Sequence, residues 1–261
     1  MNKYFLLSLA VIMISITVKA QKNIKSWHKN QVIAHRGAWK TTNLPENSIA
    51  SLQQAFAIGC YGSEFDVQLT SDSVPVVNHN RDFLGKDIAS STYQELVDYK
   101  MLSNGEHIPT LEAYLKAGIK QKKTKLILEI KAQKTLEMEI VLTKKILNLV
   151  HQLKASPWIE YISFSSNVCK YLIDYEKGAK VSYLNGELSP AQLKEQGYYG
   201  LDYNHKVFRK NIGWLAEAKV AGLVSNVWTV NTEKDMDYFL SQGVDYITTN
   251  EPELLLKKLE H

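Results

Sequence analysis

Short apolar runs rich in β-branched residues alternate along the chain with segments of helical periodicity. Eight of these runs are predicted strands, at residues 32–35, 63–69, 125–130, 161–164, 180–183, 200–203, 223–229 and 245–248. Strands that alternate with helices are typical of βα units around a parallel sheet, and eight units favour a TIM-type (β/α)8 barrel. A doubly wound open sheet stays the alternative, because periodicity does not separate a closed sheet from an open one.

The segments between the predicted strands have the spacing of amphipathic helices. They cover residues 48–58, 111–117, 136–153, 168–175, 190–195, 212–220, 234–240 and 252–259. The chain has 261 residues, of which 45% are hydrophobic, and this is enough to bury one large core. We find no internal boundary and therefore predict a single barrel domain over residues 21–261.

The first 20 residues have the layout of a signal peptide. Lys3 is followed by an uncharged apolar run over residues 4–18, and small residues flank the expected cleavage site after Ala20. A permanent transmembrane anchor is the alternative, but the run is shorter than the roughly 20 apolar residues that span a bilayer. No cysteine follows the run where a lipoprotein precursor needs one. We expect an exported protein, periplasmic or secreted, without a stable membrane anchor.

Charge and cysteine content set further bounds on function. Cleavage removes Lys3 and Lys19 and no acid, so the formal charge falls from +4 to about +2, and no nucleic-acid partner is implied. The two cysteines, Cys60 and Cys169, do not form a disulfide framework. A single bridge between them is the alternative, but they fall in separate barrel segments, so we expect two free thiols.

A strand-like run at residues 75–79 follows the second predicted strand after only a short turn. Such a short connection forces an antiparallel hairpin, because a parallel return needs a crossover of about a dozen residues. If Ser71 faces Val74 across the turn, counting back places Asp66 opposite His79. The barrel is therefore predicted to carry a hairpin insertion after its second strand, which brings a carboxylate and an imidazole together.

Two carboxylates on the second predicted strand are candidate metal ligands. Glu64 and Asp66 are one residue apart, so their side chains point to the same face of the strand. The opposite face is apolar and suited to packing under helices, so the acids are expected to face the barrel interior. Buried together they repel, so either a cation or a raised pKa must neutralise them, and a hard divalent cation is the natural solution. The alternative is an exposed strand face with two solvated acids.

Other charged side chains lie at the ends of further predicted strands, where barrel active sites gather. Glu129 can complete an oxygen site and Lys131 can hold an anion beside it, although a structural salt bridge explains this pair equally well. His35 offers a proton carrier near neutral pH, and Arg36 a fork for phosphate oxygens. With His79 from the hairpin, the set predicts a site that binds one cation and one phosphate and moves protons.

Two further positions carry weaker signals. Glu46, Asn47 and Ser48 open a predicted helix, and Asn47 or Ser48 is interpreted as its cap, with a further role for Glu46 left open. Trp228 lies near the end of a late strand. It is predicted to wall the substrate pocket, with burial in the core as the alternative.

Eight ordered motifs spread over nearly the whole mature chain closely resemble those of the glycerophosphodiester phosphodiesterases. They are AHRG (34–37), PENS (45–48), EFDVQLT (64–70), PVVNH (75–79), IPTLE (108–112), LEIK (128–131), WTVN (228–231) and TTNEP (248–252). The resemblance implies a TIM-type barrel related to phosphatidylinositol-specific phospholipase C. It also implies a small-molecule substrate, a glycerophosphodiester such as glycerophosphocholine or glycerophosphoethanolamine, split into glycerol phosphate and an alcohol.

The resemblance also implies roles for individual residues. His35 and His79 match the acid–base pair of the family, whose cofactor is one divalent cation, calcium or magnesium. The implied metal ligands are Glu64, Asp66 and Glu129, and the implied phosphate contacts are Arg36 and Lys131. The family usually has aspartate after the second histidine, where this chain has Asn80. A substitution there is expected to weaken activity unless Asp82, two residues on, takes over.

Three other functions remain as alternatives. The same site could act on another phosphodiester, such as a lysophospholipid or glycerophosphoinositol. The chain could be a weakly active or non-catalytic exported phosphodiester-binding protein, and Asn80 would then be a sign of the lost activity. The retained histidines and acids argue against this. A glycoside hydrolase could use Glu64 and Glu129 as its carboxylate pair, but this leaves the histidines and basic residues without a task.

Overall fold

The computed structural model describes residues 27–260, so the predicted signal peptide lies outside the described residues. Eight parallel strands follow one another around a barrel in the order β1-β11-β10-β9-β8-β7-β6-β2. The strands are β1 (Val32–Ala34), β2 (Gly62–Leu69), β6 (Lys125–Ile130), β7 (Ile159–Ser163), β8 (Val181–Tyr183), β9 (Gly200–Asn204), β10 (Val224–Trp228) and β11 (Tyr246–Thr249). Pairing of β1 with β2 closes the ring, which confirms the TIM-type barrel over the open sheet.

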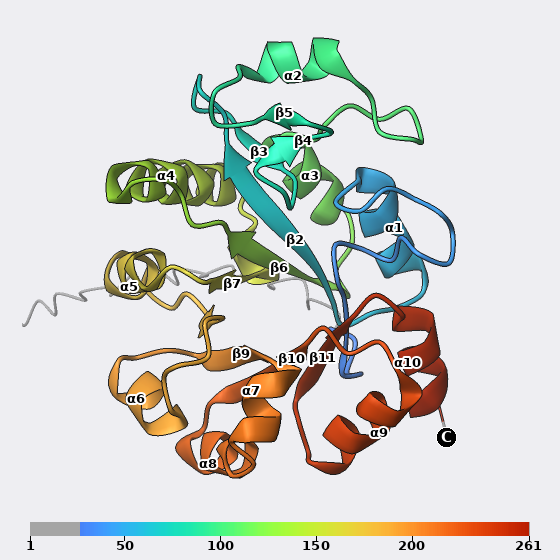
Figure 1. Ribbon diagram of the computed structural model, residues 1–261, viewed down its shortest axis with the longest axis vertical. Coiled ribbons are helices and arrows are strands. Elements are labelled where there is room, and N and C mark those ends of the chain that lie inside the picture. The colour runs from blue at the N-terminus through green and yellow to red at the C-terminus, as the bar shows by residue number, and fades with distance from the viewer. Residues whose placement is uncertain (1–26, 261) are drawn as a thin grey trace, which may run out of the picture.

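Helices surround the barrel (Figure 1). They are α1 (Ile49–Ala57), α2 (Tyr93–Tyr99), α3 (Leu111–Gly118), α4 (Leu136–Gln152), α5 (Ser166–Tyr175), α6 (Pro190–Glu195), α7 (His205–Lys210), α8 (Trp214–Ala221), α9 (Glu233–Ser241) and α10 (Pro252–Leu259), with a 3-10 turn at Ser156–Trp158. Serine or threonine caps most of their N-termini, as Ser48 does for α1. The predicted helices agree within two residues at each end, while α2 and α7 were not predicted.

The main core lies between the barrel wall and the helices. Phe65, Val67 and Leu69 point outward from β2 into this layer, and the Phe65 ring packs against Tyr114 of α3 at 4.5 Å. This placement confirms that the opposite face of β2, with Glu64 and Asp66, lines the barrel interior. Cys60 and Cys169 are both buried and free, as expected.

The hairpin after the second strand is present, but its predicted register is wrong by one residue. β3 (Pro75–Val77) runs antiparallel to β2 with Leu69 opposite Pro75 and Val67 opposite Val77. The turn has three residues instead of two, because Ser73 adopts a left-handed conformation with φ of 61°. Asp66 therefore lies opposite Asn78, whose backbone N–H donates to the Asp66 carbonyl at 3.0 Å, and His79 follows one position later.

The chain between β3 and α3 builds a small layer over one side of the barrel (Figure 1). Two short strands, β4 (Asp82–Phe83) and β5 (Lys86–Asp87), pair antiparallel and precede α2. A separate apolar cluster holds this layer together, formed by Val76, Phe83, Ile88, Leu96 and Ile108. Within residues 27–260, no helix is both long and apolar enough to cross a bilayer.

Candidate active site

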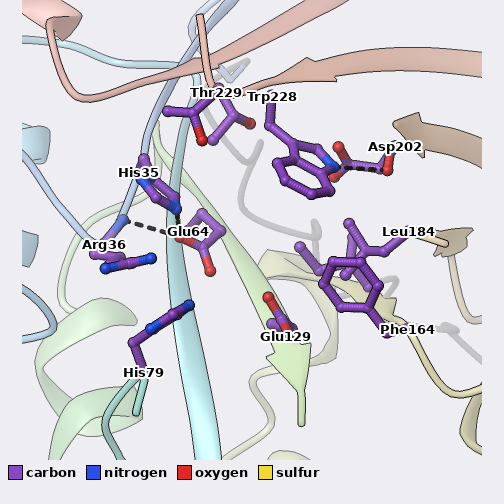
Figure 2. A pocket seen from close by; sticks show the side chains of 12 residues that line it. His35, Arg36, Glu64, His79, Glu129, Phe164, Leu184, Asp202, Trp228 and Thr229 are labelled. Atoms are coloured by element: carbon purple, nitrogen blue, oxygen red, sulfur yellow. Dashed lines mark hydrogen bonds and ion pairs between the residues drawn. The ribbon is translucent and has the colours of Figure 1, made fainter. Parts of the chain in front are cut away.

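Side chains from the C-terminal ends of several strands meet around one cavity of about 130 Å³ (Figure 2). One half of the lining is charged or titratable and comes from β2, β6 and the loops after β1 and β3. The other half is mostly apolar. The lining residues are His35, Arg36, Glu64, His79, Glu129, Ile162, Phe164, Leu184, Asp202, Trp228, Thr229 and Thr248.

Three buried carboxylates form the acidic centre of the site. One oxygen each from Glu64, Asp66 and Glu129 lies within 4.8 Å of the others. Burial and the neighbouring acids raise the pKa of Glu64 well above its ordinary value. Burial and the Asp66 charge raise the pKa of Glu129 to about 8. Within the described residues Glu64 Oε1 has no hydrogen-bond partner. These acids therefore lack the positive charge that would let all three ionise.

Asp66 is the one acid of the three that is well compensated. Lys131 Nζ donates to Asp66 Oδ1 at 3.1 Å and also contacts Glu129 Oε1 at 2.8 Å. Asn47 donates to Asp66 Oδ2 at 2.9 Å and accepts from the Asp66 backbone N–H at 3.2 Å. Burial alone would raise the pKa of Asp66, but Lys131, His79 and Asn47 lower it below its ordinary value.

Arg36 links the first strand to this acidic centre. Its backbone N–H donates to Glu64 Oε2 at 2.9 Å, and its guanidinium donates to Glu46 at 2.7 Å. Arg36 takes a left-handed conformation with φ of 58°, and Gly37 follows with φ of 84° against the backbone of α1. The left-handed turn through Arg36 and Gly37 therefore directs both the backbone and the side chain of Arg36 toward the acids.

The two predicted histidines lie in the same pocket, each held by an asparagine. His35 Nδ1 lies 2.7 Å from Asn250 Oδ1, and its Nε2 lies 4.0 Å from Glu64 Oε2. His79 Nδ1 lies 3.0 Å from Asn80 Oδ1. Burial, then the Arg36 charge, lowers the pKa of His35 to about 4. Burial also lowers the pKa of His79. Asparagine oxygens accept hydrogen bonds, so both rings carry their proton on Nδ1 when neutral.

The aromatic half of the cavity faces the acids across the barrel mouth. Trp228 lines the cavity, and Phe164 packs edge-on against it at 5.6 Å. The Trp228 indole N–H donates to the backbone carbonyl of Asp202 at 2.9 Å, which fixes the ring (Figure 2). The structure thus places Trp228 at the pocket, the first of the two positions considered for it.

All eight candidate residues from the sequence lie at or beside this cavity, but other members of the site were missed. Of the two predicted caps, Asn47 and Ser48, Ser48 caps α1, whereas Asn47 donates a hydrogen bond to Asp66. Asn250, in the motif at 248–252, contacts His35, a role that the sequence did not predict. Asp82 does not replace the missing aspartate, because its side chain accepts from Gly85 in the β4–β5 turn. The motifs at 45–48 and 248–252 were the only signals for these residues.

The donor set fits a hard divalent cation. Three oxygen ligands converge, one of their oxygens is unpartnered within the described residues, and burial beside the other acids raises the pKa of Glu64 and of Glu129. Oxygen-rich, carboxylate-dominated sites are the ones that calcium and magnesium prefer. Lys131 and Arg36 lie beside the acids and, within the described residues, leave Glu64 Oε1 without a partner.

Comparison with known proteins supports one family over most of the chain. The glycerophosphoryl diester phosphodiesterase family matches residues 35–254. A glycerophosphodiester phosphodiesterase from Caldanaerobacter subterraneus subsp. tengcongensis is 32% identical, over 87% of this chain and 97% of its own. The crystal structure of one from Parabacteroides distasonis is 48% identical, with a TM-score of 0.86 over 90% of this chain and 98% of its own. The chain therefore belongs to the glycerophosphoryl diester phosphodiesterase family and is a phosphodiester hydrolase of that family.

Proposed function

We propose that this enzyme hydrolyses glycerophosphodiesters to glycerol phosphate and an alcohol with the help of one divalent cation. The observation that carries the proposal is the convergence of three buried acids, two imidazoles and two basic side chains on one cavity. Hydrolysis of a phosphodiester can use each of these groups, whereas hydrolysis of a glycoside would use only two of the acids.

Glu64, Asp66 and Glu129 would hold the cation, either calcium or magnesium. A bound cation supplies Lewis-acid stabilisation to the charge that accumulates on the phosphate oxygens. The unpartnered Glu64 Oε1 and the raised pKa values of Glu64 and Glu129 support this assignment, because both acids gain from a nearby positive charge. Asn47 orients Asp66 from behind through its two hydrogen bonds.

Arg36 and Lys131 would bind the phosphate. Both are mostly buried beside the acids, where water screens their charges only weakly, so their field at a bound phosphate is strong. Glu46 holds the Arg36 guanidinium in place. In this arrangement the two basic residues add to the stabilisation of the transition state without moving.

His35 and His79 would move the protons. One accepts the proton of the attacking oxygen, and the other protonates the departing alkoxide. If that oxygen is a glycerol hydroxyl, a cyclic phosphate forms, and water then opens it to glycerol phosphate with the two roles exchanged. Asn250 and Asn80 bind Nδ1 of each ring and leave Nε2 for the substrate. A proton carrier of this kind contributes about 10²- to 10⁴-fold to the rate.

The test uses glycerophosphocholine and glycerophosphoethanolamine with the wild-type protein and the variants His35→Ala and His79→Ala. We expect the wild type to release glycerol phosphate and each variant to lose about 100-fold or more in kcat with an unchanged circular dichroism spectrum. Near wild-type turnover by either variant would remove that histidine from the acid–base pair. Release of a phosphoalcohol in place of glycerol phosphate would assign the site to a different bond.

We further propose that the enzyme acts outside the cytoplasm after cleavage following Ala20. The support is the charged start, the apolar run and the small residues before Gln21. Expression of the full chain in a bacterial host should give a protein whose first residue is Gln21 by mass spectrometry of the periplasmic fraction. An intact N-terminus in the membrane fraction would mean that residues 1–20 act as an anchor.

A further inference from the structure

One acid in the substrate cavity takes no part in the proposed chemistry. Asp202 lies on β9, and the ring order β1-β11-β10-β9-β8-β7-β6-β2 places β9 four strands from β2 in either direction. Asp202 is therefore diametrically opposite Glu64 and Asp66 across the barrel mouth, at the far end of the same cavity. Figure 2 shows it behind Trp228, away from the histidines.

The Asp202 carboxyl is buried, and no basic side chain among residues 27–260 pairs with its charge. The residue is 3% exposed, and its Oδ1 has no hydrogen-bond partner within the described residues. None of the ion pairs among residues 27–260 involves it. Burial raises its pKa to about 7, against the opposite effect of a hydrogen bond with the Asn226 side chain. A buried acid in this condition is stabilised by any cation or donor that reaches it.

The side chains around Asp202 favour a cation over a neutral donor. Trp228 and Phe164 form an aromatic corner at this end of the cavity, and the Trp228 ring is fixed by the Asp202 carbonyl. Aromatic faces attract ammonium groups, and tryptophan does so most strongly. A carboxylate beside an aromatic corner thus forms a small pocket for an alkylammonium group.

The opposite end of the cavity has the complementary character. Arg36 and Lys131 lie there with the histidines, where the phosphate is proposed to bind. With a cation held by the three acids at this end, a substrate with a negative phosphate and a positive amine two carbons away would place its phosphate here and its amine toward Asp202. Such a zwitterion is the head group of an ethanolamine or choline phosphodiester.

We propose that Asp202 is a specificity-determining residue that receives the cationic nitrogen of an aminoalcohol head group while the phosphate lies between the histidines. This inference rests on the proposed function and names the part of the substrate that the apolar half of the cavity selects. A primary ammonium donates an N–H to the carboxylate, so ethanolamine gains more from Asp202 than choline, whose quaternary nitrogen has no N–H.

A small cavity of about 20 Å³ beneath Asp202 suggests a competing role. Asn226, whose Oδ1 is also unpartnered, lines this cavity with Asp202. The volume has room for about one water molecule, which could satisfy both oxygens without any contact to substrate. The two roles predict different effects of replacing the carboxylate. If Asp202 contacts the substrate, the loss of activity depends on the head group, and if it binds only the buried water, the loss is the same for every head group.

The test compares kcat/KM on three substrates for the wild type, Asp202→Asn and Asp202→Ser. The substrates are glycerophosphoethanolamine, glycerophosphocholine and the uncharged-headed glycerophosphoglycerol. We expect both variants to lose roughly 10- to 100-fold on the ethanolamine substrate, less on the choline substrate and under about 3-fold on glycerophosphoglycerol. Asp98→Asn, the same change at an exposed position of α2, is the matched control and should leave all three values unchanged.

Each outcome has one interpretation. A loss confined to the cationic head groups supports the proposal. An equal loss on all three substrates, or no loss on any, overturns it and assigns Asp202 to the buried water. If the wild type cleaves glycerophosphoglycerol but neither cationic substrate, the inference fails while the proposed function stands. If the wild type cleaves none of the three, the proposed function fails first.

Discussion

At the scale of single residues, Asn80 can orient His79 in place of an aspartate. The resemblance in sequence implies aspartate at this position, and the amide oxygen of Asn80 lies 3.0 Å from His79 Nδ1. Asparagine therefore keeps the hydrogen bond that orients the ring and omits the negative charge. Asn250 makes the same contact with His35 at 2.7 Å. Both imidazoles are thus oriented by neutral acceptors.

Replacing Asn80 with aspartate tests this explanation. A carboxylate would keep the hydrogen bond and stabilise the imidazolium of His79, so Asn80→Asp should leave kcat unchanged or raise it by up to about 10-fold. Asn80→Ala removes the acceptor and should lower kcat by about 10-fold. Steady-state kinetics on glycerophosphoethanolamine measures both. A large loss in Asn80→Asp would mean that the ring is organised differently from that of the relatives.

Asp202 also has a predicted effect on stability that is separate from its proposed role with substrate. Its pKa is raised from 3.8 to about 7 by burial, so between these values the folded protein binds more protons than the unfolded chain. Folding stability therefore falls as pH rises through this window. Asp202→Asn removes the effect and should raise the free energy of unfolding by about 2–4 kcal/mol at pH 8, but by under about 1 kcal/mol at pH 4.

Urea denaturation of the wild type, Asp202→Asn and the exposed control Asp98→Asn at the two pH values checks this prediction. The control should match the wild type at both. If Asp202→Asn is less stable than the wild type at pH 8, the carboxylate makes a favourable contact that outweighs its burial.

The acids of the site could be predicted from the sequence, but their partners could not. Glu64 and Asp66 share a strand face because of the two-residue period of a β-strand, which holds whatever the rest of the chain does. Asn47, Asn250 and Asp202 reach the cavity only through the folding of loops and the order of strands. No local pattern in the sequence fixes these positions.

At the scale of elements, the hairpin shows what the local sequence pattern predicts and what it does not. The proximity of the two runs predicted an antiparallel pair, and β2 and β3 form one. The register depended on whether the turn held two or three residues, and this was decided by the left-handed conformation of Ser73. Serine seldom takes that conformation, so a serine at position 73 does not predict the longer turn. His79 nonetheless reaches the cavity, because the chain bends into the site after β3.

The loop between β1 and α1 should be the element most sensitive to a small change. Gly37 has a φ of 84°, and a Cβ there would lie 2.7 Å from the backbone carbon of Ser51. Gly37→Ala should therefore lower the free energy of unfolding by about 2–4 kcal/mol and reduce activity through displacement of Arg36.

Gly178→Ala is the matched control for this change, because Gly178 has the same φ of 84° and open space around it. It should cost only about 1 kcal/mol and leave activity intact. Thermal unfolding and kinetics measure both variants. Equal losses in the two would mean that backbone conformation, and not the contact with α1, limits position 37.

At the scale of the whole molecule, closure of the barrel was the step that periodicity left open. The eight strands were predicted in number and place, and an open sheet would have contained the same strands. Pairing of Ile33 with Gly62 and of Ala34 with Ser63 closes the ring and brings His35 beside Glu64. Closure also places Asp202 across the mouth from the acids, so the proposed selection of head groups depends on the barrel as a whole.

The most direct test of the account is the dependence of glycerol phosphate release on a divalent cation. Chelation should abolish release by the wild type, and either calcium or magnesium should restore it. Glu129→Gln should need about 10-fold more cation for half-maximal activity, because it removes one charged ligand. Full activity in chelator would contradict the central claim, since it would leave the three buried acids without a cation and assign catalysis to another arrangement of the site.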